Sequence, residues 1–226
     1  MATLRLLACV AVLGWAACLG ASASADTISY SGSVPLTETD WASSVSIAKF
    51  DPALGTLNSI EIELQGHMEG TAKFEHRGSN AATVTTYLSA DLLVQRPDLS
   101  NLVVGAGLTV TTVDSVTGFD GTVDFGGTSG RTHGALSANL TNTTLTSLTA
   151  DLALFTGTGD IVLPVLASAS SAATGSGNMV FDFTNLASAG VKVTYDYAPV
   201  PEPSTLVGLV GMGLVGLALV WRRRRA

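Results

Sequence analysis

Cysteine is nearly absent from this chain of 226 residues. The only two, Cys9 and Cys18, lie within the first 18 residues. If that segment is removed on export, the remaining chain has no disulfide, no thiol nucleophile and no cysteine ligand for a metal. Its stability must then come from a packed core.

Positive charge is also scarce. Between residues 26 and 200 there are 6 basic against 17 acidic side chains, a net charge of −11. A surface of this sign repels the phosphate backbone of nucleic acids. This balance argues against a nucleic-acid partner.

The segment also lacks the residue patterns of common catalytic and metal sites. It has no HExxH and no GxSxG motif. His67 and His76 fall on opposite faces of one alternating segment, and His133 lies in a glycine-rich stretch. We therefore expect no enzymatic activity, no cofactor and no metal. A secreted hydrolase is an alternative, which would need at least two polar groups converging in a cleft.

Long apolar runs are missing from the centre of the chain but occur at both ends, at residues 6–19 and 206–221. The first run follows Arg5 and ends in small residues, which is typical of a secretory signal peptide. Ala23 and Ala25 would occupy the −3 and −1 positions for signal peptidase. The alternatives are an N-terminal core helix and a lipoprotein signal.

The second run begins shortly after Pro201, Glu202 and Pro203 and is followed directly by an arginine cluster. Sixteen helical residues span about 24 Å, which is short of the ~30 Å hydrocarbon core of a bilayer. Arginines after a short apolar run favour the cytoplasmic side, so the preceding chain is expected outside. The cluster consists of Arg222, Arg223, Arg224 and Arg225.

This tail resembles the PEP-CTERM sorting signal of Gram-negative bacteria. The resemblance implies that an exosortase recognises Pro201, Glu202 and Pro203 and processes the chain near them. It also implies that residues 206–221 hold the protein in the inner membrane only transiently, with the arginines as a cytoplasmic stop-transfer signal. The protein would then reach the cell surface or the extracellular space. A plain membrane anchor that stays in place is the alternative.

Alternation of period two dominates the segment between the termini, clearest from Ser59 to Arg77. Nineteen residues exceed the usual length of one strand, so we expect a bend or turn near Gly66 to Gly70. Other expected strands lie at residues 28–36, 45–50, 84–94, 102–112, 136–140, 148–154, 179–183 and 191–197. Nine or ten such strands and no helix predict an all-β antiparallel sandwich, jelly-roll-like.

Three short motifs carry a second resemblance. Phe50–Leu57, Phe155–Asp160 and Val191–Tyr197 look like parts of the choice-of-anchor domains, most like type E. That family pairs a β-rich extracellular domain with differing sorting tails, and it implies no catalytic residue. The expected organisation is a signal peptide at 1–25, an extracellular β-sandwich at 26–198 and a sorting tail at 199–226.

One loop offers candidate metal ligands. Asp120 and Asp124 lie in a glycine-rich stretch that matches neither an EF-hand nor a G-G-x-G-x-D repeat. Calcium binding by these two residues is one hypothesis, and a role as turn residues is the alternative. The sequence as a whole predicts an exported, non-enzymatic protein of the cell surface or of a biofilm-type matrix containing exopolysaccharide. The alternative is a carbohydrate-binding or adhesive module, with exposed aromatic residues around a groove near Trp41 or Tyr87.

Overall fold

The computed structural model describes residues 25–200 and 220–225. The signal-peptide residues before Ala25, the Pro-Glu-Pro motif and most of the apolar run lie outside the described residues. Among the residues that are described, no helix is both long and apolar enough to cross a membrane. Val220 to Arg225 form a short helical segment in which the Arg225 guanidinium lies 3.6 Å from the centre of the Trp221 ring.

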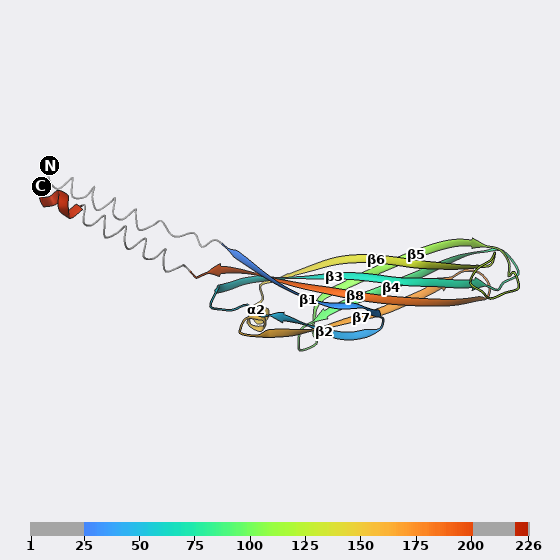
Figure 1. Cartoon of the computed structure of the whole chain (residues 1–226), viewed down its shortest axis with the longest axis horizontal. Coiled ribbons are helices and arrows are strands. Elements are labelled where there is room, and N and C mark those ends of the chain that lie inside the picture. The colour runs from blue at the N-terminus through green and yellow to red at the C-terminus, as the bar shows by residue number, and fades with distance from the viewer. Residues whose placement is uncertain (1–24, 201–219, 226) are drawn as a thin grey trace. The chain divides into compact units, whose positions relative to one another are not determined.

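Eight strands and one short helix make up residues 25–200 (Figure 1). The strands are β1 (Asp26–Glu38), β2 (Trp41–Ala48), β3 (Gly55–His76), β4 (Ala82–Gln95), β5 (Asn101–Val116), β6 (Gly130–Thr146), β7 (Asp160–Thr174) and β8 (Met179–Pro199). The helix α2 (Thr149–Phe155) lies between β6 and β7.

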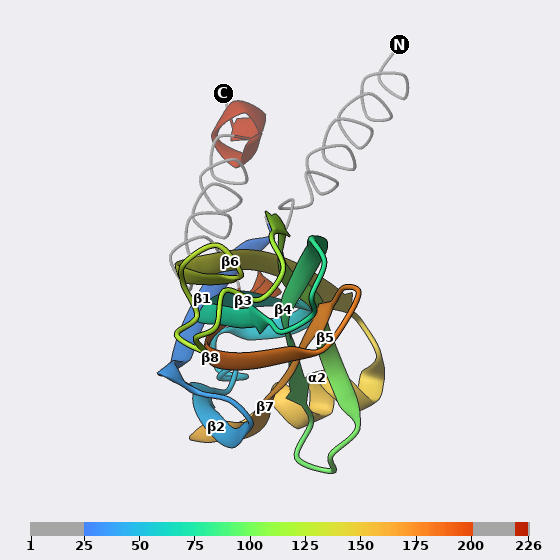
Figure 2. The same ribbon diagram turned by 90° about the vertical axis from the view of Figure 1, so that its right-hand side faces the viewer.

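The strands form two four-stranded sheets, in the orders β1-β8-β3-β6 and β2-β7-β4-β5 (Figure 2). The pairs β2–β7, β3–β6, β4–β5 and β4–β7 are antiparallel. Strands adjacent in space are mostly not adjacent in sequence, as crossovers between the sheets of a sandwich require. The predicted antiparallel all-β architecture is confirmed, with eight strands instead of nine or ten.

The core lies between the sheets because alternate residues of the strands point inward. In β3 the buried series includes Ile60, Ile62 and Leu64, and in β4 it includes Leu88 and Leu92. Burying each such side chain contributes about 1.5–3 kcal/mol. Residues 26–200 contain no cysteine, so the burial of these alternating side chains, and not a disulfide, stabilises the domain.

A bend or turn was expected near Gly66 to Gly70, and the turn was wrong, since β3 continues through both glycines. Its register with β6 shifts between Gly70 and Ala72, a local bulge that leaves the strand unbroken. The glycines serve close packing: a Cβ at Gly70 would lie 2.4 Å from the Thr184 carbonyl oxygen. Glycine at this position therefore allows the backbone of β8 to approach β3 closely and does not mark a turn.

The strand expected at residues 148–154 was also wrong, as was the expectation of no helix. The segment forms α2, whose buried residues are Asp151 and Phe155, four positions apart as on one face of a helix. β7 was overlooked, although Ile161, Leu163 and Val165 alternate inward along it. The two strands expected at residues 179–183 and 191–197 form the single strand β8.

Thr27–Pro52 and Leu57–Asp196 form one compact unit. In this unit, Tyr195 is fully buried within ring contacts to Tyr30, Phe50 and Phe155, with centroids 5.9–6.4 Å apart. Burial raises the pKa of the Tyr195 phenol.

Candidate functional site

The histidines occupy separate local environments. His67 lies on the outward face of β3 and contacts Asn139 and Glu69 at 2.7 and 3.0 Å, and the Glu69 carboxylate raises its pKa. His76 is buried, with Nδ1 3.1 Å from the Thr117 carbonyl oxygen. The structure thus places these two histidines on opposite faces of one strand, as the alternation predicted.

His133, in the glycine-rich stretch noted above, lies on β6 and not in a loop. Its Nε2 is 2.7 Å from a carboxylate oxygen of Asp114 on β5, so the pair connects edge strands of the two sheets. The same carboxylate is 4.0 Å from the Arg131 guanidinium. These contacts account for His133 as part of a surface pairing between strands.

The candidate calcium ligands lie in the loop between β5 and β6. Asp120 accepts hydrogen bonds from the N–H groups of Thr122 and Thr128 at 3.2 and 3.1 Å, and these bonds lower the pKa of its carboxyl group. Asp124 accepts the N–H of Gly126 at 2.9 Å. Both carboxylates therefore close turns of their own loop. Within the described ranges no three His, Cys, Asp or Glu side chains gather so as to hold a metal ion.

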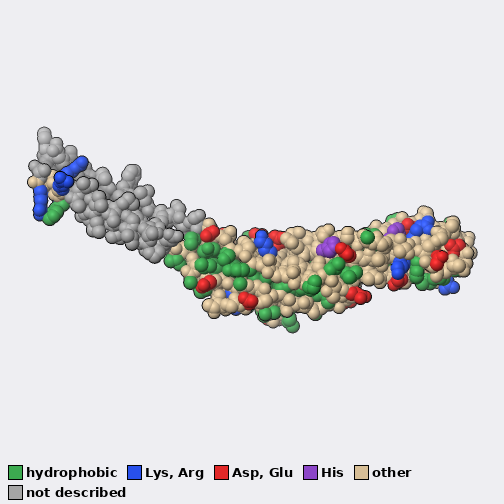
Figure 3. All heavy atoms as spheres, viewed as in Figure 1, with side chains coloured by type: hydrophobic (Ala, Val, Ile, Leu, Met, Phe, Trp, Pro, Cys, Tyr) green, Lys and Arg blue, Asp and Glu red, His purple; other side chains and the backbone are tan. Residues whose placement is uncertain are grey.

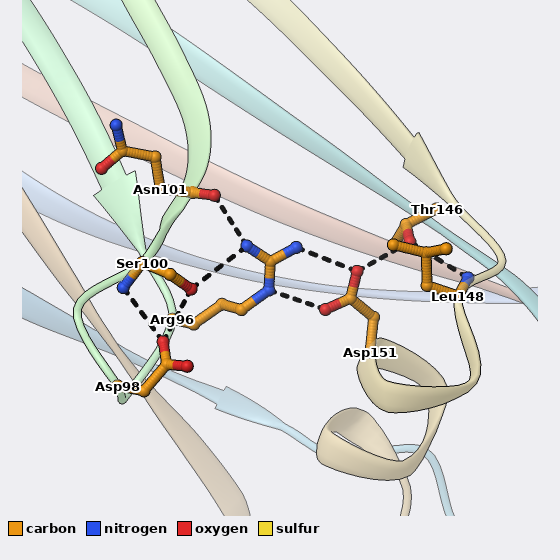
Figure 4. Close-up of polar contacts among 7 residues, drawn as sticks. All are labelled: Arg96, Asp98, Ser100, Asn101, Thr146, Leu148 and Asp151. Atoms are coloured by element: carbon orange, nitrogen blue, oxygen red, sulfur yellow. Dashed lines mark hydrogen bonds and ion pairs between the residues drawn. The ribbon is translucent and has the colours of Figure 1, made fainter.

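The best-developed buried charge pair joins Arg96, after β4, to Asp151 on α2 (Figure 4). The guanidinium donates two hydrogen bonds to the carboxylate, at 2.7 and 3.0 Å, and the Thr146 hydroxyl donates a third at 2.7 Å. The Arg96 guanidinium lowers the pKa of Asp151, whose residue is only 3% exposed. Arg96 also donates to the Asn101 carbonyl at 2.7 Å. The arrangement fixes α2 against the β4–β5 connection.

A groove of about 640 Å³ lies on the solvent-facing side of the sheet β2-β7-β4-β5. The strand registers align Ala42, Leu166, Leu93 and Val104 in one row across all four strands. These residues lie on the face opposite to the core series, and Val104 is 49% exposed. Such a continuous apolar row is unexpected on a solvent-facing sheet surface.

Polar side chains lie around this apolar row. Asp40, Asp91, Asn101 and Ser168 contribute to the lining, which contains no Lys, Arg or His among the described residues. Trp41 also lines the groove, and its indole N–H donates to the Ala187 carbonyl at 3.2 Å. The carbohydrate-binding alternative required exposed aromatic residues around a groove near Trp41 or Tyr87, and Trp41, which is half-buried, lies at this groove.

Tyr87, the other aromatic candidate, is 39% exposed on β4 and does not line the groove. On the face shown in Figure 3, charged side chains of both signs are spread over a surface that is mainly uncharged.

The predicted processing residues are only partly described. Ala25 is exposed and precedes β1, whereas Ala23, Pro201, Glu202 and Pro203 lie outside the described residues. Arg222 to Arg225 are exposed in the short terminal helical segment. The placement of the cleavage and recognition motifs is therefore a prediction from sequence.

Comparison with known proteins identifies the tail. Residues 199–225 match the family model described as the PEP-CTERM protein-sorting motif. This motif is the recognition signal for exosortase, and it implies export to the cell envelope or surface of a Gram-negative bacterium. No curated protein matches the chain in sequence.

Similarity to solved structures is weak. A chain from the structure of infectious bursal disease virus Gt strain is 10% identical, with 88% of this chain and 48% of that chain covered and a TM-score of 0.20. A Desmodium yellow mottle tymovirus chain is 13% identical, with coverages of 80% and 86% and a TM-score of 0.23. The chain thus spans about half the length of the first of these matches. Similarity at these TM-scores supports no inference about fold or function.

Proposed function

We propose that this protein is a non-enzymatic component of the cell surface or extracellular matrix, which exosortase releases from a transient membrane-bound state. The supporting observation is the sorting motif at residues 199–225. In this proposal the β domain is the exported part, and signal peptidase removes residues 1–25. The resemblance of the β domain to choice-of-anchor type E agrees with a domain that is joined to a sorting tail.

The contacts of the chemically reactive side chains support a non-enzymatic role. His67, His76 and His133 each contact a different part of the fold. The pair of Arg96 and Asp151 holds α2 in place, and both charged groups form hydrogen bonds with each other and with nearby polar groups. A hydrolase would instead require a nucleophile or base directed into a cleft.

Deleting residues 200–226 tests the sorting proposal. The deleted form should stay in the periplasm or medium and lack the processing step, whereas the full chain should reach the envelope or surface and lose its tail. Glu202→Ala should impair processing, and Glu61→Ala, which alters an exposed acidic residue of β3, should not. Unchanged localisation and mass after the deletion would contradict the proposal.

The groove supports a second candidate function, the binding of a neutral saccharide. The apolar faces of sugar rings pack on tryptophan and aliphatic side chains, and their hydroxyl groups bond to carboxylates and amides. Leu93 and Leu166 supply the first kind of surface, and Asp91 and Asn101 the second. Without a cation in its lining, the groove should disfavour acidic polymers.

Titration with neutral glucan oligosaccharides, followed by NMR or calorimetry, tests this candidate against polyuronate oligomers. Leu93→Asp places a charge on the groove floor and should weaken binding at least about tenfold, or ~1.4 kcal/mol. Val113→Asp is the matched control, since Val113 is 66% exposed on the same sheet face and outside the groove. Equal binding by both variants, or preference for the polyuronate, would refute the assignment.

A further inference from the structure

The residues directly before the sorting motif form backbone hydrogen bonds with the neighbouring chain of the sheet. β8 continues to Pro199, and the N–H of Val200 donates a hydrogen bond to the Leu54 carbonyl at 3.1 Å. The strand order places β8 between β1 and β3, so it is not an edge strand. Regular backbone pairing therefore reaches to within one residue of Pro201.

Gly55 allows the end of β8 to approach very closely. A Cβ at this position would lie 2.1 Å from the Ala198 carbonyl oxygen and 2.9 Å from the Cα of Pro199. Both neighbouring atoms belong to the backbone, so no side-chain rotation could relieve the overlap. Any larger residue at position 55 would push the end of β8 away.

A side-chain hydrogen bond to β1, the other strand beside β8, also holds the end of β8 in place. The hydroxyl of Tyr197 donates to a carboxylate oxygen of Asp26 at 3.2 Å, and Tyr197 is only 8% exposed. Asp26 is the first residue after the predicted signal-peptide cleavage site. The residues that adjoin both predicted processing sites are thus in contact.

Pairing and burial of a backbone limit its cleavage. A peptide bond inside a sheet must leave the sheet before it can enter the active site of an enzyme. The rate of its cleavage is then proportional to the small population of the locally opened form. Residues 197–199 lie within β8, and Val200, which is 59% exposed, shares this protection through its backbone hydrogen bond to Leu54. Pairing of the described strands ends at Val200.

We propose that the folded β domain sets the upstream limit of C-terminal processing, so that the cut falls at the Val200–Pro201 bond or on its C-terminal side. This inference rests on the proposed function, because it specifies where that processing occurs. The reaction breaks one backbone C–N bond. The acyl carbon passes to water or to an acceptor amine, and a proton from that nucleophile goes to the departing amine.

The first test is the intact mass of the processed protein from an exosortase-containing host. The mature chain should end at Val200 or later, and a chain that ends at Pro199 or earlier would overturn the inference. A tail that is retained entirely would contradict the proposed function. In that case the second test alone decides the inference.

The second test digests the signal-cleaved full chain in detergent with proteinase K and maps the C-termini by mass. Wild-type protein should be cut at least tenfold more slowly within residues 197–200 than beyond them, and equal rates would overturn the inference. Gly55→Ala should raise the upstream rate. Gly134→Ala is the matched control, because a Cβ there meets nothing within 4 Å. A rise of the upstream rate in both variants, or in neither, would contradict the role assigned to Gly55.

Discussion

Replacing Asp151 by Asn should measure how much the pair with Arg96 contributes to folding. Asn keeps one carbonyl acceptor, so at least one of the two charge-assisted bonds is lost, together with the negative charge. Hydrogen bonds to charged groups contribute about 1.5–3 kcal/mol, and breaking a fully buried ion pair costs about 3–5 kcal/mol.

The Arg96 side chain is 22% exposed, so water partly solvates the guanidinium when its partner is lost. We therefore expect a loss of about 2–3 kcal/mol in the free energy of unfolding, near the lower end of these ranges. For a domain of this size that corresponds to a fall of about 4–12 °C in Tm.

Urea and thermal unfolding at pH 7 would measure the loss. Asp182→Asn is the matched control, because its 3.0 Å pair with Lys73 is solvent-exposed and should contribute at most about 1 kcal/mol. If the two substitutions were equally destabilising, the structural role assigned to Asp151 would be refuted.

Three further predictions concern stability. The folded-state pKa of Asp151 is lowered, so its contribution is present above the unfolded value of about 3.9 and is lost as pH falls through the folded value. The difference between wild type and Asp151→Asn should therefore shrink below about pH 4 in urea titrations. Tyr195→Phe removes the hydrogen bond to the Ala48 carbonyl and should cost about 1 kcal/mol, read from the urea midpoint. Gly70→Ala should cost about 1–3 kcal/mol by overpacking, whereas Gly134→Ala should leave Tm nearly unchanged; equal effects would contradict the packing argument.

The sheet architecture was predictable because inward and outward residues alternate along most strands. α2 was not, because this helix of about two turns after Leu148 is stabilised by a partner far away in sequence. Asp151 is buried only because Arg96 approaches from the β4–β5 connection. The turn expected near Gly70 failed for a similar reason, since the glycine accommodates the Thr184 carbonyl of β8.

The candidate sites, too, could be predicted where they depend on local sequence and not where they depend on residues far apart in the chain. The sorting tail could be predicted, because its tripeptide, apolar run and arginine cluster are contiguous in sequence. The groove could be placed only near Trp41, since its apolar row depends on registers between four strands. No local pattern relates Ala42 to Leu166 or Leu93 to Val104.

The intact mass of the protein, recovered in parallel from a host with exosortase and from the same host without it, tests the central claim most directly. The account predicts a chain that begins at Asp26 in both hosts and lacks the arginine-terminated tail only where exosortase is present. A chain that keeps Arg222 to Arg225 in both hosts would contradict the account.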